Sequence, residues 1–572
     1  YDDIHLVVCS GTGFNEIYSF PGDMRNASCY GKIGLTYPRR TNKRLAPRIM
    51  PGGCAFGDKG PAIVDIQGSP WALLAILNSR PISYLVGLAL GASETEGGAG
   101  ANSYEVGLIQ RLPIPKEALN DPILESNANT AWACRAKKDI YDESTCSFTL
   151  PFPSTSEKNS LESHFYKISE CQNNNIHSYL KCLSAIDEQV CNLYRFSESD
   201  WNAIQEKGGD AHMPEFMSLE QPKFKTANAS SFISYFVGSA LGRWDIRFAT
   251  GVRQPPEFVD PFDPIPACSP GMLQNAHGMP AEPADEPNDY PLRITWPGIL
   301  VNDEAHVSSE GKSEDIVARI RDALTVIWGD QATAIEQESC DILNVKVIRD
   351  YFSEGKTGGK FFKEHLTRFS KSRRKAPLYW PLSTESGTYT LWFYYHRLSA
   401  NTLYTAVEKF IDPKQEEAKE TFAKLNAKQS RSQDEDKELE AAQLLVAELA
   451  TFRESLLETA KFWKPDLNDG VQITAAPLWK HFRLKSWQKT LKDTWSKLEH
   501  GDYDWAHLAH SIWPERVIQK CITDRSLAIA HGHDEALWVE VTDAKGKSKW
   551  QTRQNAEDIA KELISQRTGL KL

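Results

Sequence analysis

The sequence predicts an α+β protein of several domains, in which a small β-rich module is followed by mostly helical domains that include an antiparallel helical hairpin. Three observations support this fold class. The chain has 572 residues, which is too long for one hydrophobic core and indicates several domains. Short β-like runs between glycine and proline turns fill its first part, and stretches with the 3- and 4-residue spacing of amphipathic helices fill much of the remainder.

Residues 1–118 are expected to form the β-rich module. Cys54–Phe56 and Ala62–Ile66 are short β-like runs bounded by turns, and the pattern changes to a helical period at Trp71. Five cations concentrate before these runs in an otherwise acidic chain, which marks a place where a polyanion such as DNA could bind. These candidate DNA-binding residues are Arg39, Arg40, Lys43, Arg44 and Arg48. The structural alternative is that Arg39 or Arg40 pairs with an acidic neighbour such as Asp58.

Two predicted domains follow along the chain. Residues 119–230 have a polar, helical pattern and are expected to form a connector of packed helices. Residues 231–402 are expected to form an α+β domain whose long proline-rich loop, Val252 to Asp289, has no periodicity and drapes over a neighbouring domain. A second group of candidate DNA-binding cations lies in this domain, at Lys371, Arg373, Arg374 and Lys375.

The second group of cations adjoins Tyr379 and Trp380, and cations beside aromatic rings are typical of phosphate-binding surfaces. The alternative is that the cations form a solvated loop and the aromatic run belongs to a core. We expect the two rings to be partly buried supports rather than base-stacking platforms. If both basic segments hold one duplex, they should lie exposed on the same side of the protein.

Two further domains complete the prediction. Residues 403–462 keep helical spacing on both sides of a polar break at Ser430–Asp436, which predicts the antiparallel hairpin. Its charged outer faces favour an intramolecular spacer over a partner-binding coiled coil. Residues 463–572 are rich in tryptophan and are expected to form a packed terminal domain with one weakly basic face, made by Lys480, Arg483, Lys485 and Lys489.

Several segments resemble the target-recognition region of large adenine-specific DNA methyltransferases of the DISARM class 1, BREX and type IIG phage-defence groups. In those families a helix with the pattern Leu-Leu-x-x-Leu-Asn-Ser, here Leu73 to Ser79, packs behind a strand and turn that contact DNA. The similarity continues through Tyr235–Gly251, Lys371–Val407 and Leu467–Val517. The resemblance implies that double-stranded DNA is the partner and that the chain corresponds to the C-terminal half of such an enzyme.

The motifs that would carry methyl transfer are not found in the sequence. Gln254–Phe258 has the wrong order for the Asn/Asp-Pro-Pro-aromatic motif that grips a flipped base, and Gly11–Phe14 lacks the spacing of a donor-binding loop. The chain also begins with Tyr1 rather than Met. We therefore expect no catalytic, cofactor-binding or metal-binding residue here, and the resemblance implies an upstream methyltransferase domain that binds S-adenosylmethionine.

Composition narrows the class of protein further. The net charge of −11 excludes uniform coating of nucleic acid, so a DNA contact must be local. The 11 cysteines include no C-x-x-C pair, which argues against a disulfide framework or a zinc finger and fits a reducing cytoplasm. No run reaches the roughly 18 apolar residues of a membrane span, so we expect a soluble protein.

Other chemistries find little support in the sequence. Four histidines gather near the C-terminus, but without a cysteine or a helical H-x-x-x-H pair they are expected to be surface residues rather than metal ligands. They are His507, His510, His531 and His533. Acid-x-lysine triplets of the nuclease kind occur in the predicted hairpin, where such charges are ordinary solvated faces, so no nuclease is assigned.

Two functions from different classes remain. The first is the DNA-recognition portion of an adenine-specific methyltransferase in a bacterial phage-defence system, with the methyl-transfer domain upstream. The second is a non-catalytic scaffold subunit that holds other defence-system proteins through its aromatic C-terminal domains and contacts DNA incidentally.

Overall fold

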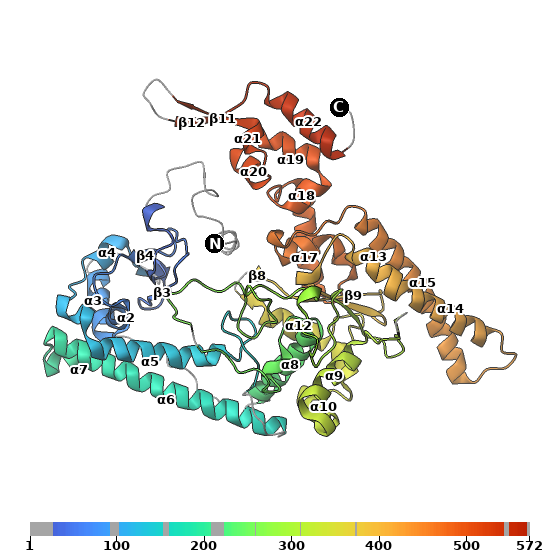
Figure 1. Ribbon diagram of the computed structural model, residues 1–572, viewed down its shortest axis with the longest axis horizontal. Helices are drawn as coiled ribbons and strands as arrows, with labels where there is room; N and C mark the ends of the chain where they lie inside the picture. Colours follow the sequence, from blue (N-terminus) through green and yellow to red (C-terminus); the bar gives the residue numbers. More distant parts are fainter. Residues whose placement is uncertain are drawn as a thin grey trace. The chain divides into compact units, whose positions relative to one another are not determined.

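A computed structural model of the chain describes residues 27–91, 102–152, 160–207, 222–257, 259–308, 311–371, 374–542 and 548–568. These residues form helices and small antiparallel sheets (Figure 1), which confirms the predicted α+β class. The chain divides into two compact units. Of the described residues, unit 1 holds those between 27 and 231 and between 247 and 280, and unit 2 holds 232–246 and those from 281 onward.

Unit 1 begins with a three-stranded antiparallel sheet in the order β3-β1-β4. The central strand β1 (Gly34–Thr36) pairs with β3 (Arg48–Met50) on one side and with β4 (Ala62–Val64) on the other. A separate antiparallel pair joins β2 (Arg40–Thr41) to β5 (Asn102–Ser103). The basic segment therefore runs from one small sheet to the other.

The strand expected at Cys54–Phe56 is wrong, because this segment forms a loop. Gly53 has a positive φ of 79° and turns the chain. The Gly53 amide donates to the Gly31 carbonyl and the Gly31 amide donates to the Cys54 carbonyl, each at 2.9 Å. These two bonds tie the loop to Gly31 and engage the carbonyl of Cys54.

Two helices meet at the Leu-Asn-Ser sequence beside β1. The first, α2 (Pro70–Asn78), begins with a proline after Ser69, whose hydroxyl accepts a hydrogen bond in the first turn. Ser79 ends α2 by donating to the carbonyl of Ile76 at 2.7 Å, and α3 (Arg80–Gly91) follows directly. The apolar side chains of α2 fill the core of unit 1, which includes Leu35, Tyr37, Leu45, Leu73, Ile76, Leu77 and Tyr104.

The long proline-rich loop contributes to the same core. The ring of Phe262 meets the ring of Trp71 edge-on, with centroids 5.3 Å apart. The Gly52 amide donates to the Phe262 carbonyl at 2.8 Å, which ties the loop to the chain after β3. The unit 1 part of this loop therefore packs over the β-rich module.

A pair of long helices forms the rest of the unit 1 scaffold. In Figure 1, α5 (Pro122–Asp139) and α6 (Leu161–Tyr194) run side by side, and both also contact α2. Asp121 begins α5 by accepting from the Leu124 amide at 2.9 Å. The other helices that start in this unit are α4 (Val106–Gln110), α7 (Glu198–Lys207) and α8 (Pro222–Ala240), the last of which continues into unit 2.

Unit 2 is built around a second antiparallel sheet in the order β6-β10-β9. Its strands are β6 (Ile299–Val301), β9 (Tyr379–Ser383) and β10 (Thr390–Tyr394), and all their residues are buried. The Phe361 ring lies 5.3 Å from Trp392 of β10 between centroids, so an aromatic core covers the sheet. The helices between β6 and β9 are α9 (Ile316–Trp328), α10 (Ala332–Leu343), α11 (Ile348–Phe352) and α12 (Lys360–Arg368).

The predicted helical hairpin is present. Its first arm is α13 (Thr402–Ala406), a π-helical turn (Val407–Ile411) and α14 (Asp412–Asn426), and its second arm is α15 (Gln433–Ala460). A capping box between Ser432 and Glu435 starts the second arm. The two arms pack against each other (Figure 1).

The terminal part of unit 2 is mostly helical, as expected, and ends with a two-stranded sheet and a last helix. Its elements are α16 (Val471–Ala475), a 3₁₀ turn η9 (Ala476–His481), α17 (Lys485–His500), α18 (His507–Ile512), α19 (Pro514–Cys521), α20 (Arg525–Ala530), α21 (Asp534–Leu537), β11 (Trp538–Thr542), β12 (Ser548–Thr552) and α22 (Ala556–Thr568).

The hairpin offers a matched test of its packing. Leu449 is fully buried at 0% exposure, whereas Leu444 on the same helix is 55% exposed. We expect Leu449→Ala to lower the free energy of unfolding by about 2–5 kcal/mol, because it leaves a cavity between the arms. Leu444→Ala should change it by less than about 0.5 kcal/mol. Urea denaturation followed by circular dichroism measures both, and equal effects would contradict the packing of the hairpin.

Candidate nucleic-acid interface

The basic loop, residues 39–48, begins with an arginine that is already paired. Arg39 binds the carboxylate of Asp58 and donates from Nη2 to Glu105 at 2.7 Å. The Ser103 hydroxyl and Arg39 together lower the pKa of Glu105. The predicted DNA-binding residue Arg39 is thus engaged with two acidic neighbours, and its role in the structure is to hold the loop in place.

Three other cations of the basic loop are differently placed. Arg40 lies in β2, Arg48 lies in β3, and Lys43 lies between them, and all three are exposed. Their side chains form no hydrogen bond or ion pair with the part of the chain that the structure describes. Their charges are therefore available to an external anion.

The backbone of the basic loop is fixed from behind by neutral groups. Asn78 of the Leu-Asn-Ser sequence donates from Nδ2 to the Pro47 carbonyl at 3.1 Å. The buried Tyr104 donates its hydroxyl to the Lys43 carbonyl at 2.8 Å, and its amide donates to the Arg39 carbonyl at 2.7 Å. These bonds hold the loop without neutralising its cations, which preorganises it for a ligand.

The fifth cation of the loop, Arg44, lines a cavity of about 150 Å³ beneath it. The cavity also exposes Arg80 and Asp187, and the Arg80 amide donates to the Asp187 carboxylate at 2.8 Å. Burial raises the pKa of Asp187, while the charges of Arg80 and Arg44 oppose that rise. Arg44 is thus half-buried and lines the same cavity as an acidic group of α6, unlike the three exposed cations.

The second basic segment forms a small hairpin in unit 2, which we call the basic hairpin. It consists of β7 (Ser370–Lys371) and β8 (Arg374–Lys375), with Lys371 paired to Arg374. Lys371 and Arg374 are exposed and Lys375 is half-buried, whereas Arg373 lies outside the described residues. Cations therefore project from both strands of the hairpin.

A buried histidine anchors the chain on both sides of the basic hairpin. His365 Nε2 accepts from the amides of Leu378 and Tyr379 at 2.9 and 3.1 Å, so this nitrogen carries no proton. Burial and the charges of Arg368 and Arg243 hold the pKa of His365 well below its usual value. A neutral acceptor thus fixes the strand that leaves the hairpin.

The aromatic residues after the basic hairpin are supports, as expected. Tyr379 and Trp380 are both at 0% exposure, so they are buried completely rather than partly and cannot stack on bases. The basic loop belongs to unit 1 and the basic hairpin to unit 2. That both face one duplex stays a prediction.

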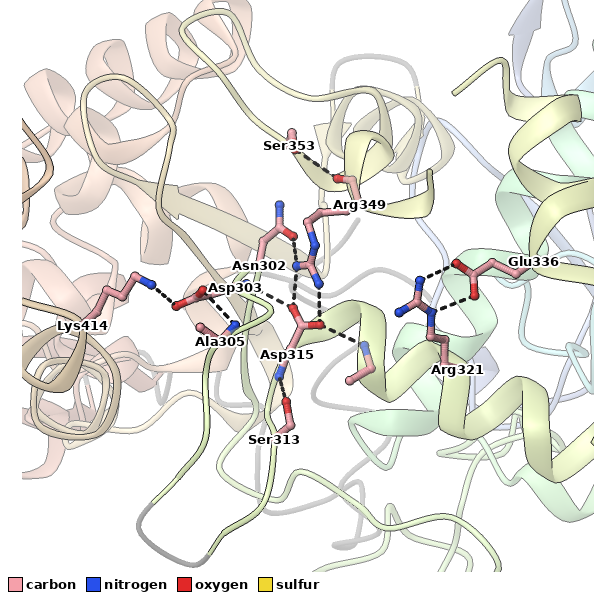
Figure 2. A network of polar contacts seen from close by, with 11 residues as sticks. Asn302, Asp303, Ala305, Ser313, Asp315, Arg321, Glu336, Arg349, Ser353 and Lys414 are labelled. Carbon is pink, nitrogen blue, oxygen red and sulfur yellow. Dashed lines mark hydrogen bonds and ion pairs between the residues drawn. The ribbon is translucent and has the colours of Figure 1, made fainter. Parts of the chain in front are cut away.

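A buried polar network lies at the start of α9 (Figure 2). Asp315 is 2% exposed and caps the helix by accepting from the Ala318 amide at 3.1 Å. Arg349 donates to both of its carboxylate oxygens at 2.8 Å and also donates to Asn302 at 2.9 Å. The Asp303 amide adds a bond to Asp315 at 3.1 Å. Because the carboxylate is fully used, the network is structural and joins β6, α9 and α11.

The network extends to the helical hairpin through one lysine. Lys414 of α14 lies 2.9 Å from Asp303 and 3.1 Å from Glu417, and it is 15% exposed (Figure 2). This contact fixes the base of the hairpin to the end of β6.

Glu354 is a buried carboxyl beneath the glycine-rich turn before α12. It is 2% exposed, and burial raises its pKa to about 8, although the Gly359 amide and the charge of Arg483 oppose the rise. Glycine is required at 359 because a Cβ would come within 2.7 Å of the backbone oxygen of Ser353, as well as of Glu354 Oε1. A pKa of this kind is typical of functional carboxyls, but the Glu354 carboxyl has no well-formed hydrogen bond within the described residues and no reacting partner faces it.

One of the four C-terminal histidines, His510, is more buried than expected. His510 is 4% exposed, its Nε2 lies 3.1 Å from Nε2 of His533, and its ring centroid lies 4.5 Å from that of His531. Burial and the neighbouring histidines lower the pKa of His510 to about 3, so His510 is neutral at its contact with His533. His507 donates from Nδ1 to the Asp469 carboxylate at 3.0 Å. The expectation of surface histidines is wrong for His510, which α18 carries into contact with His531 and His533, whereas His507 is exposed as expected and the other two are half-buried.

Two absences are confined to the described residues. They contain no group of three or more histidine, cysteine, aspartate or glutamate side chains arranged to hold a metal ion, and their cysteines are all free thiols. No helix among them could cross a membrane alone. The pair α2 and α3 reaches the required length and composition together, but it bends by 62°, and most of α2 is buried in the unit 1 core.

The buried network predicts a large effect for one substitution. Asp315→Asn keeps a helix cap, because Asn caps about as well as Asp, but it removes the charge that pairs with Arg349. We expect the free energy of unfolding to fall by about 3 kcal/mol. The control is Arg321→Ala, since Arg321 is 52% exposed and its pair with Glu336 should contribute less than about 1 kcal/mol. Urea denaturation of both variants checks this, and similar losses would speak against the network.

Glu354 predicts a stability that depends on pH. Its carboxyl stays protonated in the folded protein up to a pKa of about 8, whereas it ionises above about 4.5 in the unfolded chain. The folded state then binds the extra proton, so wild-type stability falls as pH rises through this window, by at most about 1.4 kcal/mol per pH unit. Glu354→Gln cannot ionise and should gain stability relative to wild type from pH 5 to pH 8.

Denaturation at pH 5, 6.5 and 8 measures this difference. The exposed Glu438→Gln on α15 is the control and should show no trend. A constant difference between Glu354→Gln and wild type would mean that Glu354 titrates in its ordinary range.

Comparison with known proteins does not assign the chain to a family. No protein-family model matches the chain, and no curated protein matches it significantly.

Proposed function

We propose that this chain binds double-stranded DNA and is the DNA-recognition portion of an adenine-specific DNA methyltransferase that acts in a bacterial phage-defence system. The observation that carries the proposal is the basic loop. Its exposed Arg40, Lys43 and Arg48 have no ion pair within the described residues, and neutral bonds fix the backbone on which they stand. Such cations displace the counterions of duplex DNA, which is the main source of backbone affinity.

The placement of the three cations supports a division of roles. Arg40 and Arg48 lie on short strands, and an arginine guanidinium can bind the O6 and N7 atoms of guanine in the major groove. Lys43 lies between the strands as a flexible point charge, which suits a phosphate. Arg39 is assigned to holding the loop, and Arg44 to the cavity beneath it.

The basic hairpin is proposed as a second contact. Lys371, Arg374 and Lys375 project from it, and Arg373 belongs to the same run of sequence. The strand that follows the hairpin is anchored by His365 and buried aromatic rings, so the cations stand on a rigid base.

Methyl transfer is assigned to a domain encoded upstream of this chain. That domain would bind S-adenosylmethionine and grip the flipped adenine, because this sequence shows neither the base-gripping motif nor a donor-binding loop. Such an enzyme acts in the cytoplasm, and the proposal includes further defence-system proteins as partners of its C-terminal helices. The resemblance of Leu73–Ser79 to the recognition helix of those enzymes supports this assignment.

The loop provides its own control. Replacing Lys43 by alanine should reduce the slope of log affinity against log salt by about one unit, because the chain no longer binds one phosphate. Replacing Arg40 or Arg48 by alanine should instead cost about 1–3 kcal/mol of discrimination at the one base pair that the arginine reads. Arg39→Ala should leave the slope unchanged and lower the melting temperature instead, since its partners are Asp58 and Glu105. Fluorescence anisotropy with duplex DNA at a series of salt concentrations measures the slopes.

Two results would overturn the proposal. Failure of the wild-type chain to bind duplex DNA would favour a scaffold subunit. Transfer of a methyl group from S-adenosylmethionine by this chain alone would contradict the assignment of the chemistry to an upstream domain.

A further inference from the structure

Helix α17 and the 3₁₀ turn before it carry a row of exposed lysines that the proposed function does not yet use. We call it the lysine face, and it consists of Lys480, Lys485, Lys489 and Lys492. None of these lysines forms an ion pair with a carboxylate of the described residues. Elsewhere in unit 2, exposed lysines such as Lys419 and Lys437 lie 2.6 and 3.0 Å from an acidic partner on the same helix.

The lysine face is set by the helical period. Lys485, Lys489 and Lys492 follow one another at i, i+4 and i+7, so they line one side of α17. The opposite side is buried through Trp487, Leu491, Thr494 and Leu498. The first acidic residue of α17 is Asp493, so the first two turns of this side are purely cationic.

This arrangement is unfavourable for the isolated helix. Cations near a helix N-terminus oppose the helix dipole, and like charges at i and i+4 repel each other. The first turn of α17 has no acidic residue, and its N-cap Leu484 supplies no side-chain hydrogen bond. A bound polyanion would offset the repulsion between the lysines and their unfavourable interaction with the helix dipole. Positions that are locally unfavourable in this way are expected at functional surfaces.

The surroundings hold the lysine face rigid. The buried Arg483 binds the Lys480 carbonyl and donates to the Glu385 carbonyl at 3.1 Å, so it is a support and not a surface cation. Lys492 lies 5.1 Å from the centroid of the half-buried Trp479 ring. Gly358 packs directly on Leu484, where a Cβ would come within 2.8 Å, and Lys356, two positions before Gly358, is exposed.

The kind of partner follows from what this surface lacks. None of the exposed large hydrophobic side chains of the described residues lies between 476 and 500, whereas a protein partner would require an apolar centre in the interface. Lysine is a mobile point charge that suits phosphates and reads no base pattern. A sugar-phosphate backbone is therefore a better match than an acidic protein.

We propose that the lysine face is a further contact surface for the backbone of duplex DNA and binds it without regard to sequence. This inference rests on the proposed function, because it extends the DNA contact of the chain from the basic loop and the basic hairpin to α17. In this proposal α17 contributes to the affinity for DNA and not to the recognition of its sequence.

The test replaces Lys485, Lys489 and Lys492 together by glutamine in the full chain. The salt slope of duplex binding should fall by about three units, since each neutralised phosphate contributes about 0.9. The reduction should be the same for duplexes of unrelated sequence. The matching Lys→Arg triple keeps the charge and should retain the wild-type slope, which separates a folding defect from the removal of a phosphate-binding charge.

The control triple replaces Lys419, Lys424 and Lys437 of the helical hairpin by glutamine, with the same change in net charge. It should bind as wild type does, and a reduction equal to that of the α17 triple would overturn the inference in favour of a general charge effect. An unchanged slope in the α17 triple would also overturn it. If the basic-loop variant is weakened in the same assay, the proposed function still stands; if wild type binds no duplex, both fail.

Discussion

The structure depends on fixing cationic segments with neutral groups in an acidic chain. A carboxylate that held the basic loop would also cancel its charge, and with a net charge of −11 there is no excess of positive charge to replace it. Asn78 and Tyr104 avoid this conflict, because an amide and a hydroxyl bind carbonyls without carrying charge. Arg39 shows the other solution. It forms ion pairs with two carboxylates, which fix the start of the basic loop but neutralise the charge of this one cation.

The same device recurs in unit 2 with different chemistry. His365 is kept neutral by burial and by the two arginines near it, and only a neutral imidazole can accept from the amides of Leu378 and Tyr379. Asp315 represents the opposite case, a charged group whose partner Arg349 neutralises it inside the fold. In both units, buried polar groups that carry charge are paired, and the backbone beside an exposed basic segment is held by neutral groups.

Patterns within one segment could be predicted from the sequence, and contacts between distant segments could not. The helical hairpin and the buried aromatic strands β9 and β10 follow from local periodicity, and both are present. The helix behind the basic loop was expected from the Leu-Asn-Ser pattern. The bond by which Asn78 of this pattern holds the loop reaches Pro47, 31 positions away, and could not be predicted from the local pattern. Arg39 and Glu105 are 66 positions apart, and Arg80 and Asp187 are 107 apart, so charge counting alone could not separate Arg39 and Arg44 from their exposed neighbours.

The bonds beneath the basic loop have a consequence for evolution. Asn78 and Tyr104 reach the carbonyls of Pro47, Lys43 and Arg39, which are main-chain atoms present whatever side chain the position carries. Substitution at 40, 43 or 48 therefore leaves the frame intact, while the chemistry offered to a ligand changes. A recognition surface built in this way can acquire a new specificity one residue at a time, with little loss of stability at each step.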